Sequence, residues 1–256
     1  MHKIGWLRAP LYATLAFLYL PIAVLMFMSF NASDAPFTWT GFSTKWYSVL
    51  LHSPLVIEGF KNTLIVAVIA TVMAVILGTL LAIGIARYQK SSILEAIALT
   101  PAIFPDLALA IGLLALFATF KLSLGLHSVI LSHALFCSAF VTAIVRGRLA
   151  QIDSSLEEAA QDLGDSQVGI FFRITLPSLK PAIIAGALLS FTLSLDEFVI
   201  AFFTDGPSTP TLPIVIYSMV RFGVSPEINA LATLVLLVSI VIVIIAQRNV
   251  KVQDSL

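Results

Sequence analysis

Three carboxylates lie inside long apolar stretches of the sequence: Asp106 in one stretch, and the adjacent Asp196 and Glu197 in another. A charge at the centre of a bilayer costs about 3 kcal/mol or more, so an acid that persists there has a functional role by default. The apolar stretches contain no basic residue to neutralise these acids. The alternatives are a protonated acid, a helix cap or a position facing external water. An unpaired acidic lining favours a cationic solute and argues against sulfate, phosphate or an anionic sugar.

The position of each acid follows from its neighbours. Asp106 comes after Pro101 and Pro105, which remove backbone donors and should break or kink a helix. It falls about 15 Å into its apolar stretch, near the middle of the bilayer. Freed carbonyls beside a carboxylate would favour a cation there. Asp196 and Glu197 fall in the outer half of their stretch, where Ser190, Ser194 and Glu197 share one face of a continuous helix.

Other reactive side chains indicate no chemistry. His127 and His133 lack the further ligands that a metal site needs, so polar packing or an interfacial position is the better interpretation, and no metal is expected. Cys137 is the single cysteine and forms no disulfide within the chain. We find no reactive pair typical of an intramembrane enzyme, so no catalytic residue is expected.

The elements that position the acids are membrane spans. Hydrophobic residues make up 59% of the 256 residues and charged residues 11%, against about 25% charged in soluble domains. The zero net charge gives no basic excess for nucleic acid. About 20 apolar residues cross about 30 Å of hydrocarbon. We therefore expect an all-α integral membrane protein, residues 1–256 forming one transmembrane domain with about six spans: Leu11–Phe30, Leu64–Ala86, Ile97–Phe120, Ser123–Val145, Ala182–Phe203 and Ile228–Ala246.

The basic residues orient these spans. The first apolar run, Ala9 to Ser33, is too long for a signal peptide and is interpreted as a span that stays. A cytoplasmic N-terminus places ten of the 14 basic residues inside and four outside, which satisfies the positive-inside rule. Both termini are then cytoplasmic. The residues placed inside are Lys3, Arg8, Arg87, Lys90, Arg146, Arg148, Arg173, Lys180, Arg248 and Lys251, and those outside are Lys45, Lys61, Lys121 and Arg221.

The inside loop at residues 153–177 has a helical pattern. Ser154 followed by Glu157 predicts a capping box that starts a helix. Gly164 is placed to end that helix in a left-handed conformation. Small and apolar residues recur at helical spacing and predict one apolar face, made of Leu156, Ala159, Ala160 and Leu163.

A second short helix should follow. Asp165 and Ser166 can cap it, and it should end near Pro177. Helix, glycine bend and helix would lie outside the bilayer. The two alanines of the first helix leave a low surface that another protein can approach closely. An amphipathic helix lying on the membrane surface is the alternative.

The same loop carries a family pattern. Glu158-Ala159-Ala160, then three residues, Gly164, then nine residues and Ile174-Thr175-Leu176-Pro177 resembles the EAA loop of bacterial ABC-importer permeases. The resemblance implies a type I importer permease (MetI-like) fold in the bacterial inner membrane. It also implies that the loop forms a coupling helix that docks in a groove of an ATPase subunit. The docking residues it implies are Glu158, Ala159, Ala160, Gly164, Ile174, Leu176 and Pro177.

Several further stretches resemble the permeases of polyamine importers: Ser29–Asn31, Phe42–Ser48, Ser190–Glu197, Gly206–Pro207, Leu212–Pro213, Ile216–Val220 and Val224–Thr233. That family often has two aspartates at the positions of Asp196 and Glu197. The resemblance implies import of spermidine or putrescine through a path lined by Asp106, Asp196 and Glu197. It implies as partners an ATPase dimer, a second homologous permease and a periplasmic substrate-binding protein.

No nucleotide site is expected in this chain. A P-loop needs Gly-Lys before Ser or Thr, and the sequence has no Gly-Lys dipeptide. ATP and Mg²⁺ should therefore bind the partner ATPase, and this chain should bind no cofactor. The alternatives are the same importer class with another cargo (putrescine alone, iron(III) or thiamine), or an ion-coupled secondary transporter or channel. The last gives no reason for the loop pattern, and no inverted repeat is evident.

Overall fold

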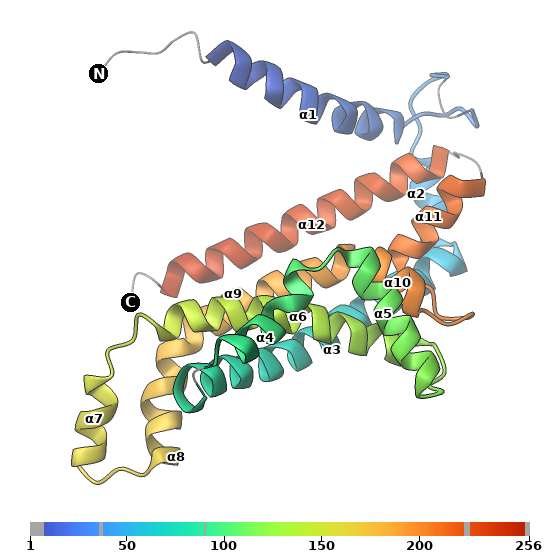
Figure 1. Ribbon diagram of the computed structural model, residues 1–256. Helices are drawn as coiled ribbons and strands as arrows, with labels where there is room; N and C mark the ends of the chain where they lie inside the picture. The colour runs from blue at the N-terminus through green and yellow to red at the C-terminus, as the bar shows by residue number, and fades with distance from the viewer. Residues whose placement is uncertain (1–7, 36–37, 90, 223–225, 254–256) are drawn as a thin grey trace. The chain divides into compact units, whose positions relative to one another are not determined.

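The computed structural model describes residues 8–35, 38–89, 91–222 and 226–253. Lys3 and Lys90, which the charge rule places inside, lie outside the described residues. The chain forms two compact units, Met1–Ile57 with Val215–Ile242, and Glu58–Ile214 with Val243–Leu256. The α-helices are labelled in Figure 1. The elements are α1 (Arg8–Met28), α2 (Lys45–Leu51), α3 (Pro54–Ile83), η2 (Gly84–Tyr88), α4 (Ser92–Ile103), α5 (Asp106–Thr119), α6 (Leu126–Leu149), α7 (Ser155–Asp162), α8 (Gln167–Ile170), η3 (Phe171–Thr175), α9 (Leu176–Asp196), α10 (Val199–Thr204), α11 (Leu212–Phe222) and α12 (Pro226–Gln253).

Each predicted span falls on helical structure. Among the described residues, four helices are long and apolar enough to cross a membrane, or five if α4 and α5 count as one broken span. The helix expected over 64–86 is longer and runs from Pro54 to Tyr88. α12 runs from Pro226 to Gln253 and contains the apolar stretch Pro226–Val241. The number of six crossings stays a prediction.

The predicted break before Asp106 is confirmed. α4 ends at Ile103, α5 begins at Asp106, and the two helices meet at 107°. Pro105 has no N–H to continue the helix, and Phe104 takes an extended conformation before it. The break places Asp106 in the first turn of a new helix, where the helix dipole favours a negative charge.

The unit that contains Glu58–Ile214 has an apolar core built mainly where α3, α5, α6, α9 and α10 meet. Gly78 of α3 allows a close approach to α6, because an added Cβ would lie 2.7 Å from the Ser138 carbonyl oxygen and from Val141 Cβ. Thr142 Oγ1 donates to the Ser138 carbonyl at 2.7 Å and lies 3.3 Å from the Gly78 carbonyl oxygen across the same contact. Small residues that let helices meet closely are typical of membrane helix packing.

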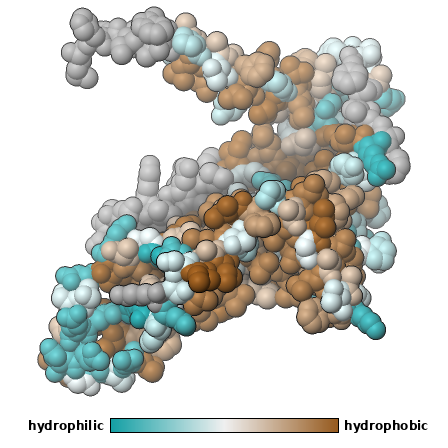
Figure 2. All heavy atoms as spheres, viewed as in Figure 1, coloured by the Kyte–Doolittle hydropathy of each residue, from teal (hydrophilic) through white to brown (hydrophobic). Residues whose placement is uncertain are grey.

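The outer faces of the long helices are apolar. α3 exposes Ile65, Val68, Val72, Ile76 and Leu80, which in water would be an aggregation hazard and in lipid are solvated. Hydrophilic residues gather instead around α7 and α8, whereas hydrophobic residues cover most of the rest of the visible face of this unit (Figure 2). This distribution fits a helical bundle in lipid with one water-facing loop.

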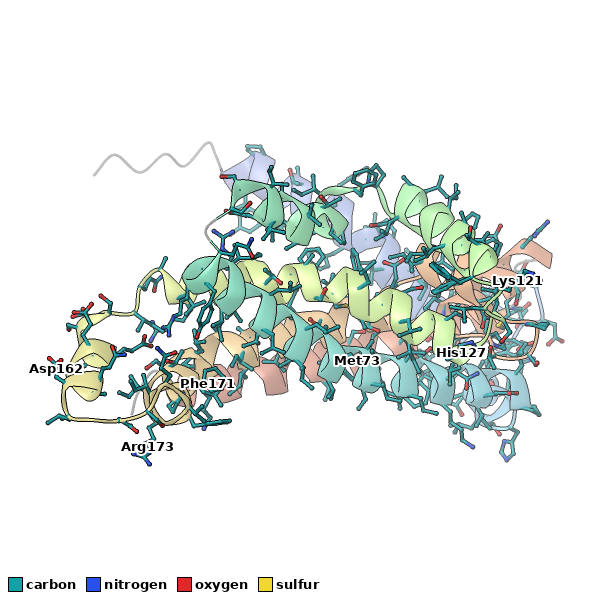
Figure 3. All side chains as sticks on the ribbon, turned by 60° about the horizontal axis from the view of Figure 1, so that its bottom comes forward. Met73, Lys121, His127, Asp162, Phe171 and Arg173 are labelled. Carbon is teal, nitrogen blue, oxygen red and sulfur yellow. The ribbon has the colours of Figure 1, made fainter. Side chains whose placement is uncertain are left out.

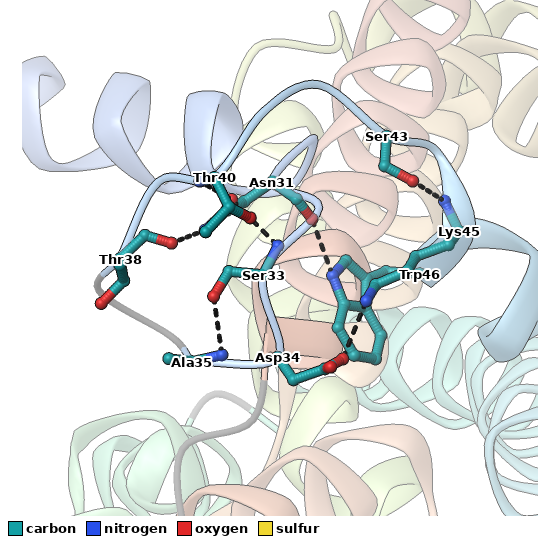
Figure 4. A network of polar contacts seen from close by, with 9 residues as sticks. All are labelled: Asn31, Ser33, Asp34, Ala35, Thr38, Thr40, Ser43, Lys45 and Trp46. Carbon is teal, nitrogen blue, oxygen red and sulfur yellow. Dashed lines mark hydrogen bonds and ion pairs between the residues drawn. The ribbon is translucent and has the colours of Figure 1, made fainter.

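The other unit carries an ordered turn after α1. The Asn31 side chain is 1% exposed, donates to the Thr38 carbonyl at 2.7 Å, and accepts from the backbone amides of Ser33 and Thr40 at 3.1 Å each (Figure 4). Trp46 Nε1 donates to the Asn31 carbonyl at 2.9 Å. One amide side chain therefore organises the segment that leads to α2.

Candidate functional site

Helix α7, the predicted docking helix, begins differently from the expectation. The Ser154–Glu157 capping box is wrong: Ser154 has helical dihedral angles and makes no side-chain cap. Asp153 takes that role, since its Oδ1 accepts from the Ser155 amide at 3.0 Å. The backbone and side chain of Ser155 donate to this carboxylate and so lower the pKa of Asp153. Glu157 does not act as a cap because Arg87 and Thr175 donate hydrogen bonds to its carboxylate.

The end of α7 is as predicted. Gly164 has a φ of +86°. The amide of Gly164 donates to the Gln161 carbonyl at 3.0 Å, and that of Asp165 to the Ala160 carbonyl at 3.0 Å. This pair of bonds is the Schellman motif, which requires a left-handed residue that glycine adopts without strain. The chain therefore turns sharply and returns toward the membrane helices.

The second helix begins as predicted but does not end near Pro177. Ser166 Oγ accepts from the Gly169 amide at 3.1 Å and caps α8. From there Gln167 to Asp196 run as one 30-residue helical stretch. The π-helical turn η3 ends at Thr175, so Pro177 falls in the first turn of α9. A missing N–H costs little at that position, which explains why the proline does not stop the helix.

The residues predicted to dock an ATPase lie on this loop. Glu158, Ala159, Gly164 and Pro177 are exposed, while Ala160, Ile174 and Leu176 are partly exposed. The predicted apolar face of α7 is also open: Leu156 is 55% exposed and Leu163 is 89% exposed. Asp162 and Arg173 lie on this loop at one end of the unit, and Lys121 and His127 lie at the other (Figure 3). These two exposed leucines lie on the hydrophilic loop rather than in the apolar core.

A polar cluster anchors α7 to the membrane helices. Glu157 Oε1 accepts from Arg87 Nη2 and from Thr175 Oγ1, each at 2.6 Å, and Arg87 Nη1 lies 3.4 Å from Thr175 Oγ1. Arg87 belongs to η2 at the end of α3, and Thr175 ends η3 before α9. We call this the anchor cluster. Sequence reasoning missed it, although Arg87 is the first basic residue after the second apolar stretch.

The adjacent acids occupy a second helix break. α9 ends at Asp196, which is exposed, and Glu197 takes an extended backbone. The expectation that Ser190, Ser194 and Glu197 share one helical face is therefore wrong beyond Ser194. Glu197 Oε1 instead accepts from the Ile200 amide at 2.9 Å and caps α10. No proline lies at this break, so the sequence did not predict it.

The structure brings two of the three acids together. α5, which begins at Asp106, packs against α10, which Glu197 caps. The carboxylates of Asp106 and Glu197 are close enough to repel each other. Asp196 lies next to Glu197 in the chain and is exposed on the surface of the structure. Asp106 and Glu197 therefore each lie at a helix break.

The serines before the break face a buried polar seam. Ser194 Oγ is 2.8 Å from His133 Nδ1, and the Cys137 thiol lies 3.5 Å from the Ser190 carbonyl oxygen. His133 and Ser194 are 1% and 2% exposed. His127 is exposed and contacts the Ser123 carbonyl at 2.7 Å. The two histidines thus lie in different environments, which agrees with their interpretation as polar packing and interfacial residues.

Comparison with known proteins identifies a family and relatives with similar sequences. Residues 75–254 match the family described as binding-protein-dependent transport system inner membrane component. The chain is 42% identical over 237 residues to the spermidine/putrescine transport system permease protein PotC of Escherichia coli strain K12, which covers 92% of this chain and 90% of that protein. It is 42% identical over 229 residues to the putrescine transport system permease protein PotI of the same strain, which covers 86% and 82%.

A solved structure shares the fold. A chain of a bacterial ABC transporter involved in the import of the acidic polysaccharide alginate has a TM-score of 0.75 and 20% identity, and the match covers 96% of this chain and 94% of that one. The expected all-α importer-permease fold is therefore confirmed, and the chain is a transport subunit and not an enzyme. On these matches, the protein belongs to the family of binding-protein-dependent transport system inner membrane components.

Proposed function

We propose that this protein is a polyamine-conducting permease subunit of an ATP-driven importer in the bacterial inner membrane. The observation that carries the proposal is the 42% identity to a spermidine/putrescine permease over 92% of the chain. The acid pair Asp106 and Glu197 supplies the chemistry, because it offers negative charge to a linear polycation at two helix breaks. Asp196 adds a third carboxylate beside them.

The fold alone does not decide the cargo. A transporter of an acidic polysaccharide has the same architecture at 20% identity, so the cargo must be read from the side chains along the path. Acids without basic partners in the apolar stretches favour a cation over an anion. The relatives at 42% identity include both a spermidine/putrescine and a putrescine permease, so spermidine and putrescine are the first two cargoes to test.

The proposal requires partners that the chain does not supply. An ATPase dimer binds ATP and Mg²⁺ and receives α7, with Glu158, Ala159, Ala160 and Gly164 at the contact and Ile174, Leu176 and Pro177 beside it. A second homologous permease completes the path, and a periplasmic substrate-binding protein delivers cargo. Both chain termini and the loop at 153–177 lie in the cytoplasm. This chain binds no cofactor or metal of its own.

Reconstitution tests the proposal. The chain is purified with its ATPase, second permease and binding protein, placed in proteoliposomes and supplied with labelled spermidine or putrescine. We expect uptake that needs ATP and that falls in Asp106→Asn. The matched control is Asp34→Asn, which neutralises an exposed acid bound to Lys45 at 2.8 Å and should leave uptake unchanged. Uptake of iron(III) or thiamine without polyamine uptake would assign another cargo, and uptake driven by an ion gradient without ATP would contradict the importer class.

A further inference from the structure

The anchor cluster has a hydrogen-bond pattern in which each member depends on the other two. Thr175 has one hydroxyl proton, which it donates to Glu157 Oε1 at 2.6 Å, so its lone pairs are left to accept from Arg87 Nη1 at 3.4 Å. Arg87 Nη2 donates to the same Glu157 oxygen at 2.6 Å. Removing any one side chain leaves the other two with lost partners, so the three act as a unit.

The cluster is shielded from water more than an ordinary surface ion pair. The side chains of Arg87 and Glu157 are 30% and 19% exposed, and Thr175 is fully buried. Salt screens such a pair less than one in open water.

Among the described residues, none of α7 belongs to the apolar core. Every residue of α7 is at least partly exposed. A cavity of about 660 Å³ lies on one side of the cluster and is lined by Arg87 and Glu157, and a second of about 270 Å³ is lined by Arg87, Glu157 and Thr175. Polar contacts of Glu157 therefore join α7 to η2 and η3.

The two helices that the cluster joins lead into the bilayer. α9 starts immediately after Thr175 and runs 21 residues to Asp196, a distance of about 30 Å at 1.5 Å per residue. Its far end is the break at which Glu197 lies close to Asp106. Both helices reach the cluster through π-helical turns, η2 and η3, which are frequent at functional sites.

We infer that the anchor cluster is the joint through which movement of α7 reaches α3 and α9, with Arg87 and Thr175 as positioning residues. The inference rests on the proposed function, in which an ATPase moves α7. The cluster passes that movement along α9 toward the acids at its other end, while the flanking cavities leave room for the loop to tilt. Breaking the cluster should separate ATP hydrolysis from transport without detaching the ATPase.

The test measures ATP hydrolysed per solute imported in the reconstituted complex. In Arg87→Ala and Glu157→Gln we expect uptake to fall by about tenfold or more, the factor set by loss of one charged hydrogen bond, while hydrolysis and ATPase retention continue. Thr175→Ser keeps the hydroxyl and should retain the wild-type ratio, whereas Thr175→Val should raise it. Exchanging the charges, Arg87→Glu with Glu157→Arg, should recover part of the lost coupling.

Arg146→Ala is the matched control. Arg146 pairs with Glu95 at the same end of the unit, but this pair joins α6 to α4 and does not involve α7. The control should keep the wild-type ratio of ATP to solute. An unchanged ratio in Arg87→Ala, or loss of the ATPase together with uptake, would overturn the joint and leave the proposed function standing. Absence of uptake by the wild-type complex would instead contradict the proposed function.

Discussion

The carboxylate of Glu197 accepts a hydrogen bond from the backbone amide of Ile200 at 2.9 Å, where α9 has ended and α10 is about to begin. The same side chain lies close enough to Asp106 for their charges to interact. Glu197 therefore has two roles that mutation can separate. Its oxygen accepts a hydrogen bond in the first turn of α10, and in the proposed function its charge lines the cation path.

Glu197→Gln should weaken cargo binding while preserving the helix cap, because the amide oxygen still accepts from Ile200. Loss of one charged contact of about 1.5–3 kcal/mol corresponds to a rise in KM for spermidine of about 10-fold to 100-fold. Glu197→Ala should add a structural defect of about 1 kcal/mol from the lost cap. Initial uptake rates over a range of spermidine concentrations check this, with thermal stability of the purified complex as the second readout. Wild-type kinetics in Glu197→Gln would remove this acid from the path.

Gly164→Val should release the ATPase while leaving the chain in the membrane. Gly164 has a φ of +86°, and a β-branched residue strains that conformation by about 1–2 kcal/mol. An added Cβ meets no atom within 4 Å, so backbone strain and the docking surface are the only things changed. Gly164→Asn is the matched variant, since asparagine tolerates the left-handed region. Co-purification of the ATPase should be lost with valine and kept with asparagine; equal retention by both would contradict the role of this turn.

The sequence predicts the local elements of the loop better than it predicts the contacts between elements. The glycine bend at Gly164 and the cap at Ser166 are local features, and both are confirmed. The cap at Ser154 failed because Glu157 binds Arg87, a residue 70 positions away. No local pattern encodes a partner so far along the chain.

The helix breaks also show where local sequence patterns predict the structure and where they do not. Pro101 and Pro105 predict a break before Asp106, and the structure has a break there. The break at Glu197 has no proline or glycine, and Pro177 lies within a continuous helical stretch because η3 ends just before it. A proline in the sequence therefore does not by itself fix where a helix ends, and the break at Glu197 shows that a helix can end without one.

Asn31→Ala should loosen the segment between α1 and α2. The change leaves the amides of Ser33 and Thr40 and the carbonyl of Thr38 without their partner. Of these residues Ser33 is buried, and its unpaired amide costs about 1–3 kcal/mol. Protease sensitivity of this segment in membrane vesicles is the measurement. Asp34→Asn removes only the exposed bond to Lys45, which is worth less than about 1 kcal/mol, and should leave digestion unchanged. Equal digestion of wild type and Asn31→Ala would contradict the organising role.

The orientation of the spans is a separate prediction. A reporter fused after Leu256 should read as cytoplasmic, because the predicted orientation with a cytoplasmic N-terminus places ten of the 14 basic residues on that side. A reporter inserted between Thr38 and Lys45 should read as periplasmic. The paired readouts separate orientation from failed insertion, which would give the same signal at both sites. Reversal of both signals would overturn the orientation.

The central claim is that α7 receives work from a separate ATPase and that this work drives cation import. The most direct measurement is spermidine uptake into proteoliposomes that hold the complete complex, with the ATPase subunit either active or inactivated for hydrolysis. The account predicts ATP-dependent uptake with the active subunit and none with the inactive one. Sustained, concentrative uptake with the inactive ATPase would contradict it.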